Sequence, residues 1–174
     1  MPRLIVLRHA KAASPANVLD IDRPLAPRGR DASTLMGRYL SDEGLVPDLA
    51  LVSPAHRTRE TWHLVQPSLG DVMVRFEPSI YAAPSPLLLT ILQEITTPSQ
   101  SVLLVGHNPG CEELVQALAG SGDVDAMERL RRKFPTAALA VIDFDGGSWA
   151  ELGPDTGRLE RFVTPAELDG GQDE

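Results

Sequence analysis

The chain has 174 residues, 43% of them hydrophobic and 23% charged, which excludes intrinsic disorder and fibrous repeats and suits a single globular domain. Its formal net charge is −8, and four of the negative charges lie in the last ten residues, where Lys and Arg are absent. This balance disfavours nonspecific nucleic-acid binding, which depends on broad positive patches.

The first half of the chain alternates short apolar runs with amphipathic stretches. In chain order, the pattern predicts a strand at 4–7, a loop at 12–27, a helix at 28–42, a strand at 48–52, a helix at 53–69 and a strand at 72–76. Apolar runs this short and β-branched are typical of strands that are buried on both faces, as in a parallel sheet.

The second half repeats the pattern, with a helix at 85–95, a strand at 102–105, helices at 109–118 and 124–133, and a strand at 139–144. The pair Gly146-Gly147 predicts a hairpin into a strand at 148–152, and 157–163 is predicted as a last, edge strand. Alternating strands and helices are typical of βαβ units. We therefore predict an α/β fold, a three-layer α/β/α sandwich with a mostly parallel central sheet and antiparallel strands at one edge. One domain is expected at 1–165, followed by an acidic, frayed tail at 166–174.

Cysteine usage and hydropathy limit where the protein works. The single cysteine, Cys111, excludes a disulfide framework and a thiolate-rich zinc site; we expect it to be buried at a helix start, with redox sensing as the alternative. No apolar run approaches the roughly 20 residues of a membrane span. The N-terminus also lacks a signal-peptide core, so we predict a cytoplasmic protein without membrane contact.

Basic side chains follow three of the predicted strands. Arg8 and His9 follow the first strand, Arg57 comes shortly after the second, and His107 follows the fourth. In open α/β sheets, ligands bind beyond the carboxyl ends of the strands. Guanidinium forks match phosphoryl oxygens, a neutral imidazole can attack phosphorus, and a second imidazole can donate to the same oxygens. The pattern predicts a phosphoryl-transfer site that needs no metal and no cofactor.

Other charged residues have plainer interpretations. Lys11 is placed at the mouth of the site, where it steers anions or is simply solvated. Asp22 and Arg23 are expected to pair and fix the loop over the site. The cluster at 129–133 is interpreted as a solvated helix face, because acidic residues flank it; binding to a phosphoprotein partner is the alternative. The 14 Arg against 2 Lys suit phosphate binding but also follow from a GC-rich genome.

Three ordered motifs resemble those of the histidine phosphatase superfamily. They are Leu7-Arg8-His9-Ala10-Lys11, Ser53-Pro54-x-x-Arg57-x-x-x-Thr61 and Val105-Gly106-His107-Asn108-Pro109-Gly110. Asp22-Arg23-Pro24-Leu25, Arg28-Gly29 and Phe134-Pro135-Thr136 are similar to the compact SixA-type branch, whose members act as phosphohistidine phosphatases. The resemblance spans residues 3–165 and implies a phosphoglycerate mutase-like fold.

Residue by residue, the resemblance implies roles for the predicted site. His9 is the nucleophile that becomes phosphorylated, Arg8 and Arg57 clamp the phosphoryl oxygens, and His107 donates to them. Ser14 is a weaker candidate for a further polar contact. The Glu that protonates the leaving oxygen in larger members aligns near Ala82, and Glu77 lies too early to replace it.

These features predict a phosphatase that acts through a phosphohistidine intermediate on His9. The expected substrate is phosphohistidine on a protein, because a protonated imidazole leaves more readily than an alkoxide and needs no positioned acid. The short chain leaves no insertion for a lid, so an open site is expected. Two alternatives remain: a phosphatase of small phosphomonoesters or nucleotides on the same scaffold, and a non-catalytic phosphate-binding module.

Overall fold

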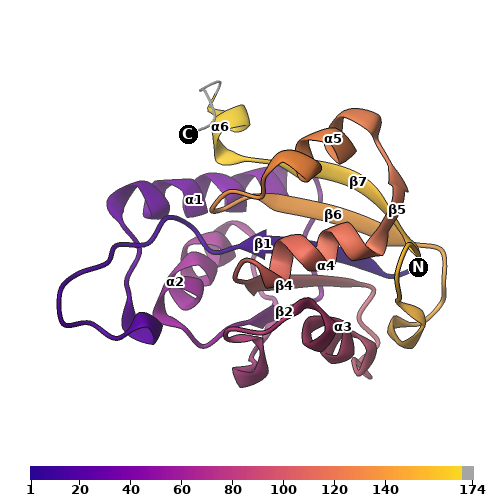
Figure 1. Cartoon of the computed structure of the whole chain (residues 1–174), viewed down its shortest axis with the longest axis horizontal. Helices are drawn as coiled ribbons and strands as arrows, with labels where there is room; N and C mark the ends of the chain where they lie inside the picture. The colour runs from indigo at the N-terminus through magenta and orange to yellow at the C-terminus, as the bar shows by residue number, and fades with distance from the viewer. Residues whose placement is uncertain (170–174) are drawn as a thin grey trace.

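The computed structural model describes residues 1–169, which form a seven-stranded sheet between two layers of helices (Figure 1). The strand order is β3-β2-β4-β1-β6-β7-β5. The strands are β1 (Arg3–Arg8), β2 (Leu49–Val52), β3 (Met73–Phe76), β4 (Ser101–Gly106), β5 (Ala119–Gly122), β6 (Leu139–Phe144) and β7 (Gly157–Val163). The helices are α1 (Pro27–Asp42), α2 (His56–Val65), α3 (Ser85–Gln93), α4 (Gly110–Leu118), α5 (Val124–Arg132) and α6 (Pro165–Leu168).

Strand β1 shows why the central strands are apolar throughout. Leu4 and Val6 pack into the core on one side of the sheet, whereas Ile5 and Leu7 pack into the core on the other side. All four side chains are fully buried, because successive residues of a strand point to opposite faces and both faces are covered.

The two helix layers cover different faces of the sheet. Met36 of α1 and Trp62 of α2 belong to one apolar core, and Leu88 of α3, Leu114 of α4 and Leu130 of α5 belong to the other. This arrangement confirms the predicted three-layer α/β/α fold. None of the helices in residues 1–169 is long and apolar enough to cross a membrane.

The sheet is mostly parallel, as predicted, but its antiparallel strand lies inside it. Strands β3, β2, β4 and β1 pair in parallel, and so do β5 and β7. Strand β6 runs antiparallel to both β1 and β7. The edges are therefore β3 and β5, and the prediction that antiparallel strands and 157–163 would form an edge is wrong.

Two segments in the C-terminal half of the chain, 148–152 and 119–122, also differ from the prediction. No strand forms at 148–152; Ser148 instead caps a short 3-10 helix, η4 (Trp149–Glu151), by accepting a hydrogen bond from the Ala150 amide. Strand β5 was not predicted, because its sequence, AGSG, has neither alternation nor β-branched residues. It forms because glycine permits close pairing with β7: a Cβ on Gly122 would lie 2.6 Å from the Leu159 carbonyl oxygen.

The first residues of the predicted tail form α6. Thr164 caps this helix, and Glu167 makes an ion pair of 2.7 Å with Arg129 of α5. Leu168 packs against the core that contains α1. This part of the segment is therefore packed rather than frayed, and residues 170–174 of the predicted tail lie outside the described residues.

The loop between β1 and α1 closes on a narrow stem. Ala12 and Leu25 form an antiparallel bridge, and the Ala13 amide donates to the Pro24 carbonyl at 2.8 Å. Gly29 of α1 rests directly on Lys11, since a Cβ there would lie 2.1 Å from the Lys11 carbonyl oxygen. Beyond the stem the loop extends past the body of the molecule and carries a 3-10 helix, η1 (Asp20–Asp22) (Figure 1).

Candidate active site

His9 and His107 face each other beyond two adjacent strands. Arg8 of β1 and Gly106 of β4 are in register, and the His9 amide donates to the Gly106 carbonyl at 3.0 Å. The next residue of each strand end is therefore a histidine at the same edge of the sheet. Their ring centroids lie 5.3 Å apart, and each histidine is 8% exposed.

Arg57 reaches the same place from the first turn of α2. Its side chain is buried, and Thr61, one turn later, donates to the Arg57 carbonyl and accepts the Ala10 amide at 3.1 Å. This pair of bonds fixes α2 to the segment that follows His9. The adjoining Ser53 hydroxyl lies 2.7 Å from Nε2 of His107. Ser53 directly follows β2 and Arg57 lies in the first turn of α2, so the motif that joins them brings both residues to the histidine pair.

Arg8 lines the opposite side of the histidine pair. Its Nη1 donates to the Phe134 carbonyl at 3.0 Å, and Nδ2 of Asn108 donates to the same oxygen at 3.0 Å. The Ala137 amide lies 3.1 Å from the carbonyls of both Arg8 and His9. The segment before β6 is therefore part of the wall, which agrees with the motif at Phe134.

Three buried nitrogen atoms at this place lack a hydrogen-bond partner. Among residues 1–169, the buried side-chain nitrogen and oxygen atoms without a partner are Nε of Arg8, Nε of Arg57 and Nδ1 of His107. A buried polar group without a partner costs about 1–3 kcal/mol. All three atoms belong to predicted site residues and can donate to an anion, so the arrangement suits a bound oxyanion.

Burial sets the protonation state of the two histidines. It lowers the pKa of His9 to about 3, against a hydrogen bond to the Ala10 carbonyl that acts in the opposite direction. Burial and the charge of Arg57 lower the pKa of His107 to about 4. Nδ1 of His9 lies 2.8 Å from the Ala10 carbonyl oxygen, which can only accept. The proton of the neutral ring therefore resides on Nδ1, and Nε2 keeps a free electron pair.

Asp20 and Tyr81 are functional candidates that the sequence analysis missed. Arg57 donates through Nη1 to the Asp20 carbonyl at 2.7 Å and through Nη2 to its carboxylate at 3.2 Å. The Tyr81 hydroxyl donates to the same carboxylate, and the edge of its ring meets the His107 ring at 5.6 Å. These contacts lower the pKa of Asp20 to about 2, the Tyr81 hydrogen bond most. Asp20 was missed because it joins the site from a loop with no regular periodicity.

The same contacts show that the loop at 12–27 is held differently from what the sequence predicted. Arg23 pairs with Asp20 at 3.3 Å rather than with Asp22. The loop lies across Arg57, so the site is not as open as predicted. Ser14 is exposed, and no hydrogen bond within residues 1–169 joins its side chain to Arg8, His9, Arg57 or His107.

Two further residues singled out in the sequence are Glu77 and Cys111, whose amide donates to the His107 carbonyl at 2.9 Å. Glu77 follows β3, and its amide donates to the Val52 carbonyl. Cys111 is fully buried, and burial raises the pKa of its thiol to about 12, which argues against the redox alternative. Within the described part of the chain no group of three His, Cys, Asp or Glu side chains is placed to hold a metal ion.

Comparison with known proteins gives these residues a family context. The family model described as histidine phosphatase superfamily (branch 1) matches residues 4–80. Phosphohistidine phosphatase SixA of Escherichia coli is 30% identical over 149 residues, which cover 82% of this chain and 86% of that protein. The chain belongs to the histidine phosphatase superfamily. An uncharacterised protein of Mycobacterium tuberculosis is 37% identical over 165 residues, covering 91% of this chain and 99% of that protein.

Solved structures place the chain in the SixA-like branch of the superfamily. A protein from Agrobacterium tumefaciens, provisionally named a phosphohistidine phosphatase SixA, matches with a TM-score of 0.80 and 33% identity, over 95% of this chain and 99% of that one. The protein histidine phosphatase SixA complexed with tungstate matches with a TM-score of 0.76 and 26% identity, over 95% and 99%. The predicted family and branch are confirmed. The protein is a phosphatase of the histidine phosphatase superfamily.

Proposed function

We propose that this phosphatase hydrolyses phosphohistidine on proteins, through a covalent phosphohistidine formed on His9. The observation that carries the proposal is the state of His9: it is buried and neutral, it is fixed by its Nδ1 hydrogen bond, and Nε2 is left with a free electron pair. An imidazole in this state is a nucleophile for phosphorus at neutral pH.

The surrounding cations suit the charge that develops during transfer. As Nε2 of His9 bonds to phosphorus, the bond to the leaving group breaks and charge spreads over three phosphoryl oxygens. Arg8, Arg57 and His107 hold the three unpartnered buried nitrogen atoms, and each can donate to these oxygens. Water then cleaves the phosphohistidine, which returns His9 and releases phosphate. The scheme places no metal and no cofactor in the reaction.

The leaving group favours a phosphoramidate. A phosphate ester leaves as an alkoxide unless an acid protonates it, whereas a protonated imidazole leaves as a neutral ring. Glu77 follows β3, and among the described residues no hydrogen bond joins its side chain to the histidine pair, so nothing identifies it as this acid. Asp20 has a pKa of about 2 and is therefore ionised at neutral pH. The SixA relatives, named as phosphohistidine phosphatases, support the same substrate.

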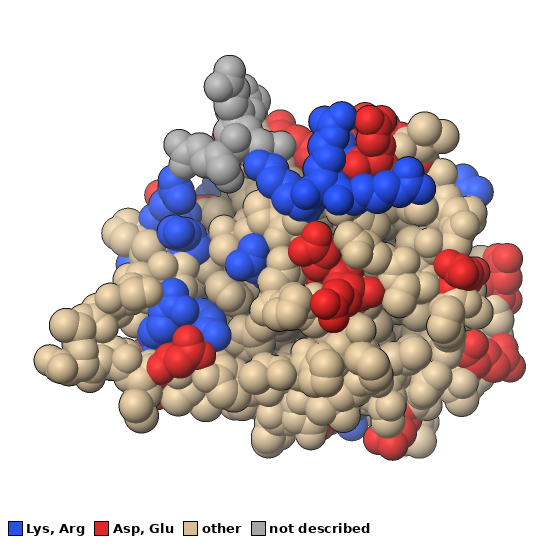
Figure 2. All heavy atoms as spheres, viewed as in Figure 1, with Lys and Arg blue, Asp and Glu red and all other residues tan. Residues whose placement is uncertain are grey.

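A groove beside the site suits a substrate carried on a protein. It has a volume of about 680 Å³ and lies between α1, residues 135–136 and α6. Lys11, which follows His9 by two residues, lines it together with Arg28 and Arg38, and Asp31 and Asp169 also line it. Lys and Arg side chains gather over the left and upper parts of this face of the molecule (Figure 2). We propose that acidic residues around a phosphohistidine dock in this groove.

Trapping the phosphoenzyme tests the proposal. Brief mixing of the enzyme with ³²P-labelled phosphohistidine protein, followed by alkaline denaturation, is expected to leave label on His9 that acid removes and alkali does not. His9→Ala should carry no label. Acid-stable label, or label that persists in His9→Ala, would contradict the mechanism. Binding of phosphate without turnover of any substrate would favour the non-catalytic alternative.

The small-molecule alternative has its own signature. If kcat/KM for p-nitrophenyl phosphate or a nucleotide exceeds that for phosphohistidine protein, the scaffold serves small phosphomonoesters instead. The buried residues Arg8, His9, Arg57 and His107 are compatible with either substrate, since both substrates present the same phosphoryl group. The comparison must therefore be made with both substrates on one enzyme preparation.

A further inference from the structure

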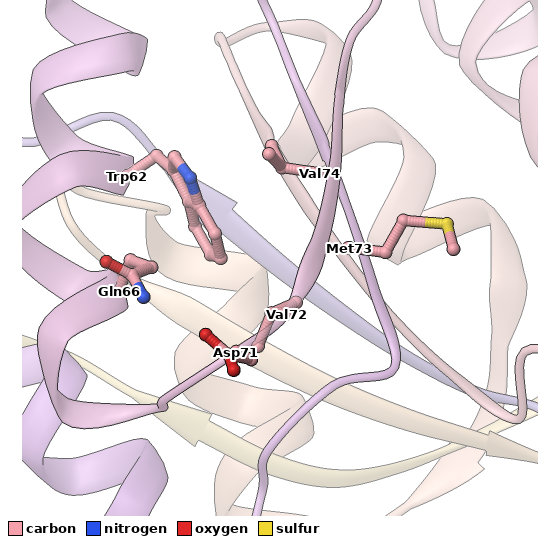
Figure 3. Close-up of a pocket in the computed structure, with 6 residues that line it drawn as sticks. All are labelled: Trp62, Gln66, Asp71, Val72, Met73 and Val74. Carbon is pink, nitrogen blue, oxygen red and sulfur yellow. The ribbon is translucent and has the colours of Figure 1, made fainter.

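Resting on the phosphatase reaction proposed above, we infer that Asp20 is a specificity-determining residue that favours substrates whose leaving group is a cationic ring. It does so by holding a carboxylate at the solvent side of the phosphoryl site, where the leaving group must depart. A second hollow of the molecule lies elsewhere. That cavity, about 430 Å³ and lined by Trp62, Gln66 and residues 71–74 (Figure 3), lies at the N-terminal end of β3, whereas the site lies beyond the carboxyl ends of the strands.

Asp20 occupies the outer edge of the Arg57 guanidinium. The side chain of Arg57 is 8% exposed, whereas that of Asp20 is 56% exposed. Nη1 and Nη2 of Arg57 both donate to Asp20, and the buried Nε does not have a partner in the described residues. A guanidinium has five N–H donors, so Nε and the remaining Nη hydrogens stay available for a phosphoryl oxygen. Arg57 can thus join the phosphoryl group on its buried edge to Asp20 on its exposed edge.

The direction of attack brings the leaving group toward Asp20. His9 is buried at the end of β1, so it attacks phosphorus from the inner side of the site. In phosphoryl transfer the attacking and leaving atoms are roughly in line, so the leaving group departs on the opposite side, toward solvent. The side chain of Asp20 is 56% exposed and is fixed by Arg57 and Tyr81, and we place the departing ring against it.

One oxygen of this carboxylate has room for a further donor. Oδ2 accepts from both Tyr81 and Arg57. Oδ1 meets Arg23 alone among the described residues, at 3.3 Å, although a carboxylate oxygen can accept two hydrogen bonds. The N–H of the cationic ring of a phosphohistidine substrate fits this position. Neutral alcohols lack the charge that would make this contact strong.

The charges around Asp20 also favour a substrate whose ring is cationic. Arg57 and Arg23 contact Asp20 directly, and Tyr81 and His107 face it as neutral groups. Without the carboxylate, a cationic ring would meet two uncompensated guanidinium groups. With it, the ring keeps its proton. When the P–N bond breaks, the electron pair goes to the departing nitrogen, and the ring leaves neutral with its proton on the other nitrogen.

The test compares two leaving groups in one variant. Asp20→Asn should lower kcat/KM for N-phosphohistidine by about tenfold or more and leave kcat/KM for p-nitrophenyl phosphate within about twofold or raise it, because a charge-assisted hydrogen bond is lost for the cation alone. Asp22→Asn is the matched control: it removes the same charge from the same 3-10 helix, and its exposed carboxylate has no contact with Arg57 or Tyr81. It should leave both values unchanged.

A second variant separates charge from geometry. Tyr81→Phe keeps the carboxylate but removes one of the bonds that fixes it, so a smaller loss with the same selectivity is expected. Equal losses for both substrates in Asp20→Asn would overturn the inference and leave Asp20 as a positioning residue for Arg57. Unchanged values for both would also overturn it. Either result leaves the proposed function intact if wild-type enzyme still forms acid-labile label on His9, whereas absence of that label refutes the proposed function itself.

Discussion

Two regions of the site are built in different ways. The floor consists of Arg8, His9, Arg57 and His107. Their side chains project from the ends of buried strands or from the first turn of α2. The rim, made of Lys11, Asp20 and Tyr81, stands on loops and is exposed or half-buried. Hydrogen bonds to the main chain fix three members of the floor: His9 bonds to Ala10, Arg8 to Phe134 and Arg57 to Asp20. Side-chain contacts fix Asp20 to Tyr81 and Arg23.

Under the proposed function, this difference separates the chemistry from the choice of substrate. The floor residues are placed by strand pairing and by the packed core, so the geometry of phosphoryl transfer is tied to the stability of the fold. The rim residues can change with little effect on that core. Substitutions in the floor should therefore affect every substrate alike, and substitutions in the rim should distinguish one substrate from another.

The largest effect is expected in the floor. Arg57→Ala should lower kcat about 10²–10³-fold for both phosphohistidine protein and p-nitrophenyl phosphate, as for loss of one positioned donor to transition-state charge. Arg57→Lys should recover little, because a lysine does not reproduce the planar fork. Steady-state kinetics on both substrates measure this. A loss confined to one substrate would break the division between floor and rim.

Acid should destabilise the fold through the buried histidines of the floor. The pKa values of His9 and His107 fall to about 3 and about 4 in the fold, whereas an unfolded histidine titrates near 6.5. Between these values the unfolded chain binds protons that the folded protein does not. Stability is therefore greatest above the unfolded pKa and falls as the pH drops below it, by about 4 kcal/mol between pH 7.5 and 5, of which each histidine contributes about half.

Urea unfolding at several pH values measures this dependence. His9→Gln should reduce the loss of stability on acidification, because one buried histidine no longer titrates. His63→Gln is the matched control, since His63 is exposed on α2 and should leave the pH dependence unchanged. Equal slopes in His9→Gln and the wild type would show that the buried ring is not held neutral by the fold.

Ser53 tests how firmly the floor is oriented. Its hydroxyl bonds Nε2 of His107, so Ser53→Ala should lower kcat about tenfold for both substrates through a less well oriented imidazole. The fold should persist but lose about 1–3 kcal/mol of stability, because Nε2 of His107 is left buried without this partner, and the melting temperature measures that loss. If turnover is unchanged, the bond to Ser53 does not orient His107.

The smallest effect is expected in the groove between α1 and α6. Arg38 is exposed on α1 and lines the groove without taking part in the histidine pair. Arg38→Ala should raise KM for phosphohistidine protein about three- to fivefold and leave p-nitrophenyl phosphate turnover unchanged, as for a rim charge in an interface. Arg75→Ala, on β3, removes an equal charge away from the groove. Equal effects of the two variants would indicate general electrostatics rather than docking.

The sequence predicts the floor well because its residues obey local rules. Buried apolar runs locate β1, β2 and β4, and the polar residues after them meet at one sheet edge because the strands are parallel. The rim does not follow from such rules. Asp20 contacts Arg57 only because the loop after β1 returns across α2, and Tyr81 contacts His107 only through the turn after β3. Strand β5 was missed for a similar reason, since its glycines pair with β7 through close backbone approach and not through apolar side chains.

The stem of the loop after β1 has a consequence for how this enzyme can be altered. Its two sides meet at Ala12 and Leu25, and Gly29 locks it against Lys11. Because both ends are pinned, the residues between them form an exchangeable module: closing a longer loop on the same stem costs little free energy, about 0.6 kcal/mol for each doubling of its length. Inserting or replacing residues there leaves His9 in place. Grafting this module alone would replace Asp20 and its bonds to Arg57, while Arg8, His9 and His107 keep their places.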